Sequence, residues 1–448
     1  MRENHSRSAA TGRRSRLTLI GLIAILNVLG TSPLVRPQTE PPRLTHGQGS
    51  GDVTATTAII WGRADKAALM QVEYATTADF ADSRRSETLI LKASDDFTGK
   101  ITLGDLTPRT RYFYRIRLAD VGDPSLESVG GTGTFVTAPA EDDRADVTFA
   151  YSGDSGEQYQ PFRVFEAMAE MRPDFFLYLG DTIYSDQGPA PARTVEEYRA
   201  RYQGNRRDAA LRRLLSLTST YVIWDDHEVA NDFNRTHPRI PIGRQAFREY
   251  WPITEYPQDP TRLYRSFRWG TLAELFILDC RQYRSPQSAR DDATKTMLGD
   301  EQNAWLKQAL RSSPAIFKFI ATTVPLRYHT NDTWEGYRTE RRELFDFILQ
   351  NGVRTVIFLS ADVHYPAVIN HPEGFKEVIV GPIAQFASPV AFARLLGGTR
   401  VEFAATNVFN YGLVRVLGDP TPRVEISLFD QRNRLLHTTV VEGEERSH

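Results

Sequence analysis

An acidic cluster with one histidine follows a short apolar run in the segment YVIWDDHEVANDF, residues 221–233. Four strand-forming residues lead directly into Asp225, Asp226, His227 and Glu228. Neighbouring carboxylates repel one another, so a folded protein that holds them together needs a cation close by. Because carboxylate oxygens and imidazole nitrogens bind metal ions, the segment indicates metal chemistry.

Acidic or metal-binding side chains also end three other apolar segments. Asp154 ends VTFAYSGD, Asp181 and Tyr184 lie in DFFLYLGDTIY, and Asp362 and His364 lie in VRTVIFLSADVH. A single aspartate after a strand is commonly a helix N-cap or a turn residue, but four such strand ends are hard to explain in this way. If the strands are neighbours in one sheet, their side chains converge at one edge. Such a cluster would hold a metal pair, and Fe, Mn, Ca, Mg or Zn would suit its ligands.

Apolar runs and helical patterns that could position these side chains alternate after residue 146. Six runs are expected to be strands, at residues 147–154, 174–184, 220–228, 272–281, 316–323 and 353–364. Apolar residues at helical spacing predict helices at residues 160–171, 194–202, 299–310 and 338–350. This alternation predicts an α/β domain over residues 146–440, with ligands beyond the carboxyl ends of its strands.

A different pattern precedes this region. Short alternating runs separated by Gly, Asp and Pro turns fill residues 44–137. They predict an N-terminal antiparallel β-sandwich, immunoglobulin- or fibronectin-like, over residues 41–138. The polar segment 137–146 contains a proline and no apolar period, so we expect a linker there.

The composition is that of an ordinary globular protein of 448 residues, with 54 Lys and Arg against 56 Asp and Glu. This balance lacks the positive field of a protein whose main partner is nucleic acid, so we expect no sequence-specific nucleic-acid binding. The chain is expected to be a monomer. Its single cysteine, Cys280, excludes an intramolecular disulfide and is expected to be a buried thiol without a ligand role.

The N-terminus has the pattern of an export signal. Residues 1–16 are basic, and the apolar run 17–30 is shorter than the roughly 20 residues of a membrane-spanning helix. We therefore expect residues 1–40 to be a signal peptide of an exported, periplasmic or secreted protein that keeps no membrane span after processing. The pair Arg13 and Arg14 favours the twin-arginine route, but Arg16 stands where that signal usually carries an aromatic residue. Ordinary secretion and an uncleaved anchor stay open as alternatives.

The order of GD-x-x-Y, W-D-D-H-E, LD-x-R-x-x-R and S-A-D-V-H resembles the alkaline phosphatase D family of metallophosphoesterases, relatives of the purple acid phosphatases. The resemblance includes residues 50–63 and 334–348 and covers nearly everything from residue 44 to residue 440. It implies a metallophosphoesterase α/β sandwich and hydrolysis of small phosphate monoesters or diesters by a water that two metal ions activate.

The resemblance also implies a role for individual residues. Asp181 would bridge both ions, and the other implied ligands are Asp154, Tyr184 and His364 on the first ion and Asp226 and Asp362 on the second. Asp225 is the next candidate if the register of the motif shifts by one residue.

Five further residues would surround the metals. His227 would hydrogen-bond a phosphoryl oxygen or protonate the leaving alkoxide, and the alternative is a core histidine that caps its own loop. Glu228 and Asn231 are expected to orient the loop and the ligands. Arg281 and Arg284 would pair with phosphate, pair with a ligand carboxylate, or form a structural ion pair.

The chain departs from the family pattern at the end of the first strand. Members commonly have Ser-Cys there, with the thiolate on iron, whereas this chain has Tyr151, Ser152, Gly153 and Asp154. Asp154 is expected to substitute as an oxygen ligand, which makes the site harder. We therefore expect two or more metal ions, Fe³⁺ with Ca²⁺, Mn²⁺ or Zn²⁺ as alternatives.

Two other functions stay open. The β-sandwich could capture a surface partner while the second domain is degenerate, although a complete set of costly carboxylates argues against this reading. The metals could also be structural Ca²⁺ ions, although Tyr184 and His364 are poor calcium ligands. A preference between monoesters and diesters would depend on the loops at residues 234–266 and 384–412.

Overall fold

The computed structural model describes residues 40–188, 190–391 and 399–444. The expected signal peptide, residues 1–40, lies outside the described residues except for its last position. Within the described part of the chain, no helix has both the length and the apolar character needed to cross a membrane.

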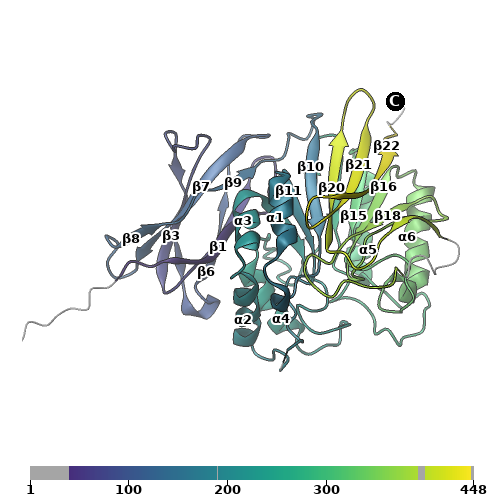
Figure 1. Cartoon of the computed structure of the whole chain (residues 1–448), viewed down its shortest axis with the longest axis horizontal. Coiled ribbons are helices and arrows are strands. Elements are labelled where there is room, and N and C mark those ends of the chain that lie inside the picture. Colours follow the sequence, from purple (N-terminus) through teal and green to yellow (C-terminus); the bar gives the residue numbers. More distant parts are fainter. Residues whose placement is uncertain (1–39, 189, 392–398, 445–448) are drawn as a thin grey trace, which may run out of the picture. The chain divides into compact units, whose positions relative to one another are not determined.

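Two mixed sheets pack face to face in the region after residue 146 (Figure 1). The first has the strand order β22-β21-β20-β10-β11-β12-β1-β2-β6, and the second has the order β13-β14-β15-β16-β18-β17-β19. The rings of Phe149 in β10 and Phe319 in β15 meet edge to face with centroids 5.2 Å apart, so the sheets share one core.

Parallel strands form the centre of each sheet, and antiparallel strands extend it. In the first sheet the parallel strands are β10 (Val147–Ser152), β11 (Phe175–Leu179) and β12 (Ser219–Ile223), followed outward by β20 (Asn410–Leu417), β21 (Arg423–Asp430) and β22 (Leu435–Glu442). The second sheet consists of β13 (Arg265–Trp269), β14 (Ala273–Ile277), β15 (Phe317–Ala321), β16 (Val356–Ser360), β17 (Ala367–Asn370), β18 (Lys376–Ile379) and β19 (Arg400–Ala404). Its strands β14, β15, β16 and β18 are parallel.

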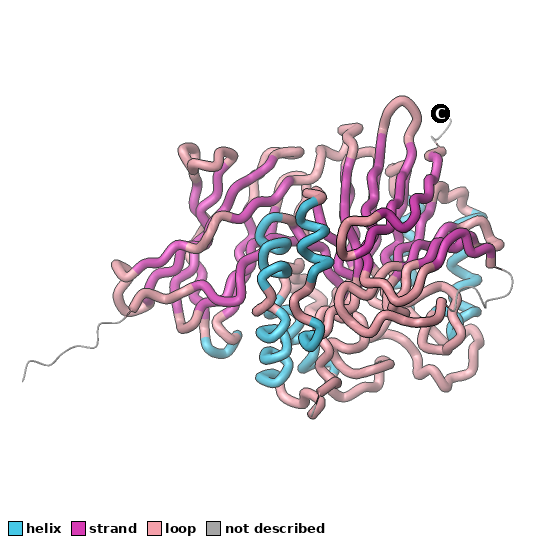
Figure 2. Tube along the Cα trace, viewed as in Figure 1, coloured by secondary structure: helices cyan, strands magenta, loops and turns pink. Residues whose placement is uncertain are grey.

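Helices cover the outer faces of both sheets, as Figure 2 shows. Helices α1 (Arg163–Glu170) and α3 (Ala209–Leu217) bury apolar side chains in the core of the first sheet. Helices α5 (Gly299–Ser312) and α6 (Arg338–Gln350) form a separate core with the outer face of the second. Helix α2 (Val195–Asn205), which begins with a capping box, contacts α4 (Ile240–Tyr250).

The predicted antiparallel β-sandwich forms before the linker. One layer consists of β1 (Leu44–Gly51), β2 (Ala58–Ala64) and β6 (Thr98–Leu103). The other consists of β3 (Ala68–Ala75), β4 (Arg84–Arg85), β5 (Leu89–Leu91), β7 (Arg111–Asp120), β8 (Glu127–Val129) and β9 (Gly133–Val136). Because β1 pairs in parallel with β12 at Gly51 and Thr220, the first layer of the sandwich continues the first sheet of the α/β region.

All six strands predicted after residue 146 form, but they belong to two sheets and not to the single sheet considered from the sequence. Strands β10, β11 and β12 lie in the first sheet, and β14, β15 and β16 lie in the second. Each sheet has helices on one face and the other sheet on its second face. A strand that is buried on both faces is apolar along its whole length, whether helices cover both faces or a second sheet covers one of them. The sequence pattern therefore cannot distinguish two packed sheets from one doubly wound sheet.

Candidate metal centre

The loops after β10, β11, β12 and β16 bring the expected metal ligands together. Ligand atoms lie within 4.8 Å of one another in three groups, which are Asp154 with Asp181 and His364, Asp181 with Asp226 and His227, and Asp225 with Asp226 and Asp362. Asp181 belongs to the first two groups and Asp226 to the last two, so the groups form one continuous cluster. Both sheets contribute to it, which is why the side chains converge although their strands do not share a sheet.

The backbone at four of these residues is left-handed. The φ angles are 67° at Asp154, 50° at Asp181, 69° at Asp362 and 59° at His364. Residues other than glycine seldom adopt this conformation, which costs on the order of 1 kcal/mol or more, and such residues gather at functional sites. The loops therefore hold their side chains in positions that a relaxed turn would not give.

Two glycines allow these loops to approach one another. Gly180 has a φ of 82°, and a Cβ there would overlap the side chain of Asp225. Gly381 has a φ of 93°, and a Cβ there would overlap Oδ2 of Asp154. A larger residue at either position would displace a carboxylate of the cluster.

Several buried carboxylate oxygens of the cluster have no hydrogen-bond donor among the described residues. Burial, together with the charge of neighbouring carboxylates, raises the pKa of Asp154, Asp181 and Asp362 well above the usual range. Both side-chain oxygens of Asp154 and Oδ1 of Asp226 are buried without a hydrogen-bond partner among the described residues. Buried carboxylate oxygens in this state fit metal ions, because a cation both neutralises and coordinates them.

Tyr184 closes the first group of ligands. Its hydroxyl lies 3.3 Å from Nε2 of His364. Burial and the charges of Asp181 and Asp154 raise its pKa well above the usual range, so the phenol is neutral when no metal is bound. The hydroxyl is thus placed where it could join Asp154, Asp181 and His364 on one ion.

Arg281 and Arg284 are both buried and pair with carboxylates. Arg281 donates to Asp225 from Nε at 2.5 Å and from Nη2 at 2.7 Å. Its Nη1 donates to both oxygens of Asp332 at 2.9 Å, and its Nη2 also donates to Asp362 at 3.2 Å. Arg284 pairs with Asp332 at 2.7 Å. Pairing with carboxylates was one of the roles expected for these arginines, and both form such pairs.

Asp225 and Asp226 differ in their surroundings. Both oxygens of Asp225 accept hydrogen bonds from Arg281, and its Oδ1 also accepts one from Thr323 at 2.5 Å. Burial would raise the pKa of Asp226, but the charge of Arg281 holds it below the usual range. Asp226 therefore keeps a carboxylate oxygen for a metal, while a ligand role for Asp225 stays a prediction.

His227 is held by a carboxylate that the sequence reasoning missed. Its Nδ1 lies 2.6 Å from Oδ1 of Asp186, whose Oδ2 accepts the backbone N–H of Asn231 at 2.6 Å. Burial alone would lower the pKa of His227, but the charge of Asp226 and the hydrogen bond to Asp186 raise it to about 9. Without bound metal the imidazole therefore favours its protonated form, in which Nε2 is a second donor. The only signal for Asp186 was a second acid in the loop that contains Asp181.

Glu228 connects two ligand loops. It is fully buried and accepts hydrogen bonds from the backbone N–H groups of Asp181 at 3.2 Å, Thr182 at 2.6 Å and Asp225 at 2.9 Å. The hydroxyl of Thr182 also donates to it at 2.6 Å. These contacts suit the orienting role expected of Glu228. Asn231 contributes its backbone to the loop and its side chain to the wall of the site.

A hollow of about 290 Å³ opens onto the cluster. Besides the metal-ligand candidates and His227, it is lined by Asn231, Asp232, Gln287, Thr330 and Asp332. Asp232 and Asp332 form a further group of close carboxylates with Asp226. Neither was expected from the sequence, because each lies about ten residues beyond the end of its strand, Asp232 after β12 and Asp332 after β15.

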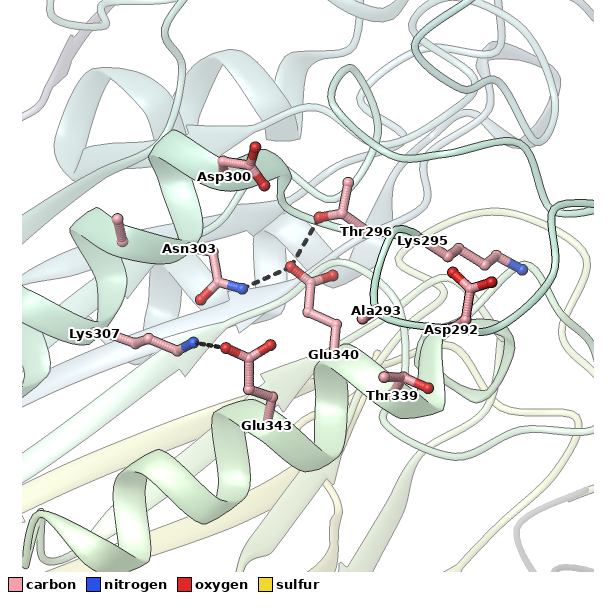
Figure 3. Close-up of a pocket in the computed structure, with 11 residues that line it drawn as sticks. Asp292, Ala293, Lys295, Thr296, Asp300, Asn303, Lys307, Thr339, Glu340 and Glu343 are labelled. Atoms are coloured by element: carbon pink, nitrogen blue, oxygen red, sulfur yellow. Dashed lines mark hydrogen bonds and ion pairs between the residues drawn. The ribbon is translucent and has the colours of Figure 1, made fainter.

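A hollow of about 390 Å³ elsewhere, between α5, α6 and the loop before α5, has a different character (Figure 3). Two of its acidic side chains, Glu340 and Glu343, already have partners. Glu340 accepts hydrogen bonds from Thr296 and Asn303, both at 2.9 Å, and Glu343 pairs with Lys307 at 2.5 Å. The ligand cluster is therefore the better candidate for a metal centre.

Cys280 has no contact that suggests a ligand role. The residue is fully buried, with Sγ 3.3 Å from the hydroxyl of Thr322. Burial raises the pKa of the thiol to about 12, so it stays protonated. The prediction of a buried thiol is confirmed.

Comparison with known proteins agrees with this arrangement. Residues 149–408 match the PhoD-like phosphatase family, and residues 30–139 match the N-terminal domain of PhoD-like phosphatases. Alkaline phosphatase D of Bacillus subtilis (strain 168) is 28% identical over an alignment of 380 residues that covers 71% of this chain and 64% of that protein. The alignment thus spans slightly less than two thirds of the relative.

Two solved structures share the fold. The structure of PhoD has a TM-score of 0.77 and 22% identity, covering 90% of this chain and 93% of that one. Purple acid phosphatase PPD1 from yellow lupin (Lupinus luteus) seeds has a TM-score of 0.63 and 13% identity, covering 90% of this chain and 74% of that one. The predicted fold class is confirmed, as is the resemblance to these metallophosphoesterases.

Proposed function

This chain belongs to the PhoD-like phosphatase family, and we propose that it is a metal-dependent phosphoesterase that hydrolyses small phosphate monoesters, diesters or both. One observation carries the proposal. A continuous cluster of aspartates and two histidines holds buried carboxylate oxygens that have no hydrogen-bond partner among the described residues. Keeping such groups ionised requires cations, and two cations beside an open hollow of about 290 Å³ would suit a phosphoryl group.

The proposed ligands divide between two ions. Asp181 would be shared, Asp154, Tyr184 and His364 would complete the first ion, and Asp226 and Asp362 would hold the second. When bound, such a pair polarises phosphoryl oxygens and lowers the pKa of a bound water to roughly 7. Fe³⁺ with Ca²⁺, Mn²⁺ or Zn²⁺ as alternatives suits these oxygen and imidazole donors.

His227 is the proposed general acid. Asp186 accepts a hydrogen bond from Nδ1, which fixes the ring and leaves the Nε2 proton for the oxygen of the leaving alcohol. Water attacks phosphorus, the ester P–O bond breaks, and the alcohol departs neutral with the proton from His227. Glu228 would keep the loops of Asp181 and Asp225 in place during this reaction.

The remaining parts of the proposal concern the whole chain. Export to the periplasm or medium, removal of residues 1–40 and a monomeric state remain proposals, as does the division into residues 41–138 and 146–440. The phosphatase activity in the name of the Bacillus subtilis relative supports, by analogy, an activity for this chain.

Metal analysis and an ester panel test the proposal together. We expect at least two metal ions per purified chain and metal-dependent hydrolysis of monoesters or diesters. Chelation should abolish turnover, and because the site has Asp154 in place of a thiolate, Mn²⁺ or Ca²⁺ should restore it. Purified protein that holds two ions but hydrolyses neither ester class would contradict the proposed function.

A further inference from the structure

A third hollow, of about 390 Å³ and distinct from the one in Figure 3, has Tyr184, one of the candidate metal ligands, in its wall. Glu157, Gln158, Gln187 and Arg201 are among the other side chains that line it. The same tyrosine packs against His227 with ring centroids 4.3 Å apart. Tyr184 thus lies between His227 and this hollow, so an alcohol leaving from the side of His227 would reach the hollow by passing Tyr184.

The charge of Arg201 distinguishes it from the two arginines beside the metal ligands. Arg281 and Arg284 are paired with carboxylates. Arg201, in α2, instead donates from Nη2 to the backbone oxygens of Gln187 and Ala190, both at 3.0 Å. These backbone contacts hold the guanidinium in place, and no carboxylate of the described residues forms an ion pair with it. The nearby carboxylate of Glu197, one turn earlier in α2, instead accepts the backbone N–H groups of Arg193 and Thr194.

The other groups of the hollow do not cancel this charge. Glu157 is its only acidic side chain among the described residues, and it forms an ion pair with Arg207 at 4.0 Å. Gln158 and Gln187 contribute neutral amides that can donate hydrogen bonds. A fixed guanidinium flanked by amides favours an oxyanion, because charge-assisted hydrogen bonds to Arg are strong and directional.

We infer that this hollow is the subsite for the alcohol part of the ester, and that Arg201 there selects esters whose alcohol carries a second oxyanion, a carboxylate or a phosphate. The inference rests on the proposed phosphoesterase function and adds the substrate class. The reacting phosphoryl group would bind at the metal cluster while the second anion binds Arg201.

A matched pair of esters tests this subsite. Phenyl phosphate and 3-carboxyphenyl phosphate differ by one carboxylate on the leaving group, and their methyl diesters serve equally if the enzyme prefers diesters. We expect the unmodified protein to have roughly tenfold higher kcat/KM for the carboxylated ester, through a lower KM, in line with one charge-assisted contact. Arg201→Gln should abolish this ratio, and Arg201→Lys should restore part of it because the charge returns.

A control separates the local effect from the general charge of the surface. Arg213→Gln removes an exposed arginine of α3 outside this hollow and should leave the ratio unchanged. Equal kcat/KM for both esters in the unmodified protein would overturn the inference while leaving the proposed function intact. So would an unchanged ratio of the two kcat/KM values in Arg201→Gln. Failure of the metal-loaded protein to hydrolyse any of these esters would instead overturn the proposed function, and the inference with it.

Discussion

At the scale of single residues, the site separates metal binding from proton transfer. Asp154, Asp181 and Asp226 present oxygens to a common space, whereas the Nδ1 side of His227 faces Asp186. Some carboxylate oxygens of the cluster are engaged, since Arg281 and Thr323 occupy those of Asp225. Both oxygens of Asp154 and Oδ1 of Asp226, by contrast, accept no hydrogen bond among the described residues. Substitutions should therefore reveal metal binding and proton transfer separately.

Replacing Asp181 by Asn should remove metal and activity together. The amide keeps the size of the side chain but lacks the negative charge that two ions would share. We expect metal analysis of Asp181→Asn to show at least one ion fewer per chain and hydrolysis to fall to background. Retention of both ions with full turnover would show that Asp181 is not the shared ligand.

Replacing Asp186 by Asn should lower turnover and leave the metals bound. Asn cannot stabilise the imidazolium of His227, so the general acid loses its proton at lower pH. We expect a decrease of roughly 10- to 100-fold in kcat for esters with poor leaving groups, less than the roughly 10²- to 10⁴-fold expected for His227→Asn. The loss should be small for esters whose alcohols leave without a proton. A metal-depleted Asp186→Asn protein would contradict this assignment.

At the scale of elements, the sequence predicted strands and helices better than it predicted their grouping. The run 175–179 is apolar throughout and is followed closely by Asp181, so both β11 and the loop after it could be located. That β14, β15 and β16 form a second sheet depends on packing between distant segments, such as Phe149 against Phe319. The left-handed backbone of Asp154 and the contact between Asp186 and His227 likewise arise only once the loops meet.

Strands β3 and β7 of the sandwich share an ion pair that should make its stability depend on pH. Glu73 in β3 accepts hydrogen bonds from Arg115 at 2.8 Å and Arg117 at 3.2 Å, both in β7. The hydrogen bond from Arg115 lowers the pKa of Glu73 from 4.5 to about 2, against the opposing effect of burial. The folded state thus binds this proton less readily than the unfolded chain does.

Because its pKa is lower in the folded protein, Glu73 stabilises the folded state only while it is ionised. Stabilisation by Glu73 is complete above about pH 4.5 and is lost as the pH falls toward 2. We expect Glu73→Gln to lower the free energy of unfolding by roughly 1–2 kcal/mol at pH 7, and the difference from the unmodified protein to shrink near pH 2. Urea unfolding at several pH values measures this, with Glu127→Gln, which removes the exposed partner of Arg117, as the control. A difference that is independent of pH would contradict the prediction.

At the scale of the whole molecule, the sandwich and the α/β region are joined by more than a linker. The described residues from 41 onward form one compact unit, and β1 extends the first sheet beside β12. Asp52, directly after β1, pairs with Arg265 of β13 through two hydrogen bonds of 2.8 Å and also accepts the backbone N–H of Thr254 at 2.7 Å. The sandwich therefore contacts both sheets that carry the site, and we expect it to unfold together with them.

Replacing Asp52 by Asn should weaken this junction strongly. Arg265 is buried, and Asn would leave its charge uncompensated, which costs on the order of 3 kcal/mol or more for a buried pair. We expect Asp52→Asn to lower the urea concentration at the midpoint of unfolding. Unfolding should remain a single transition, with the same midpoint by far-ultraviolet circular dichroism and by loss of metal-dependent activity. The matched control is Glu141→Gln, which breaks the exposed pair with Arg268 and should change the free energy of unfolding by less than about 1 kcal/mol. Two separated transitions in the unmodified protein, with activity lost only in the second, would show instead that the sandwich unfolds independently of the metal centre.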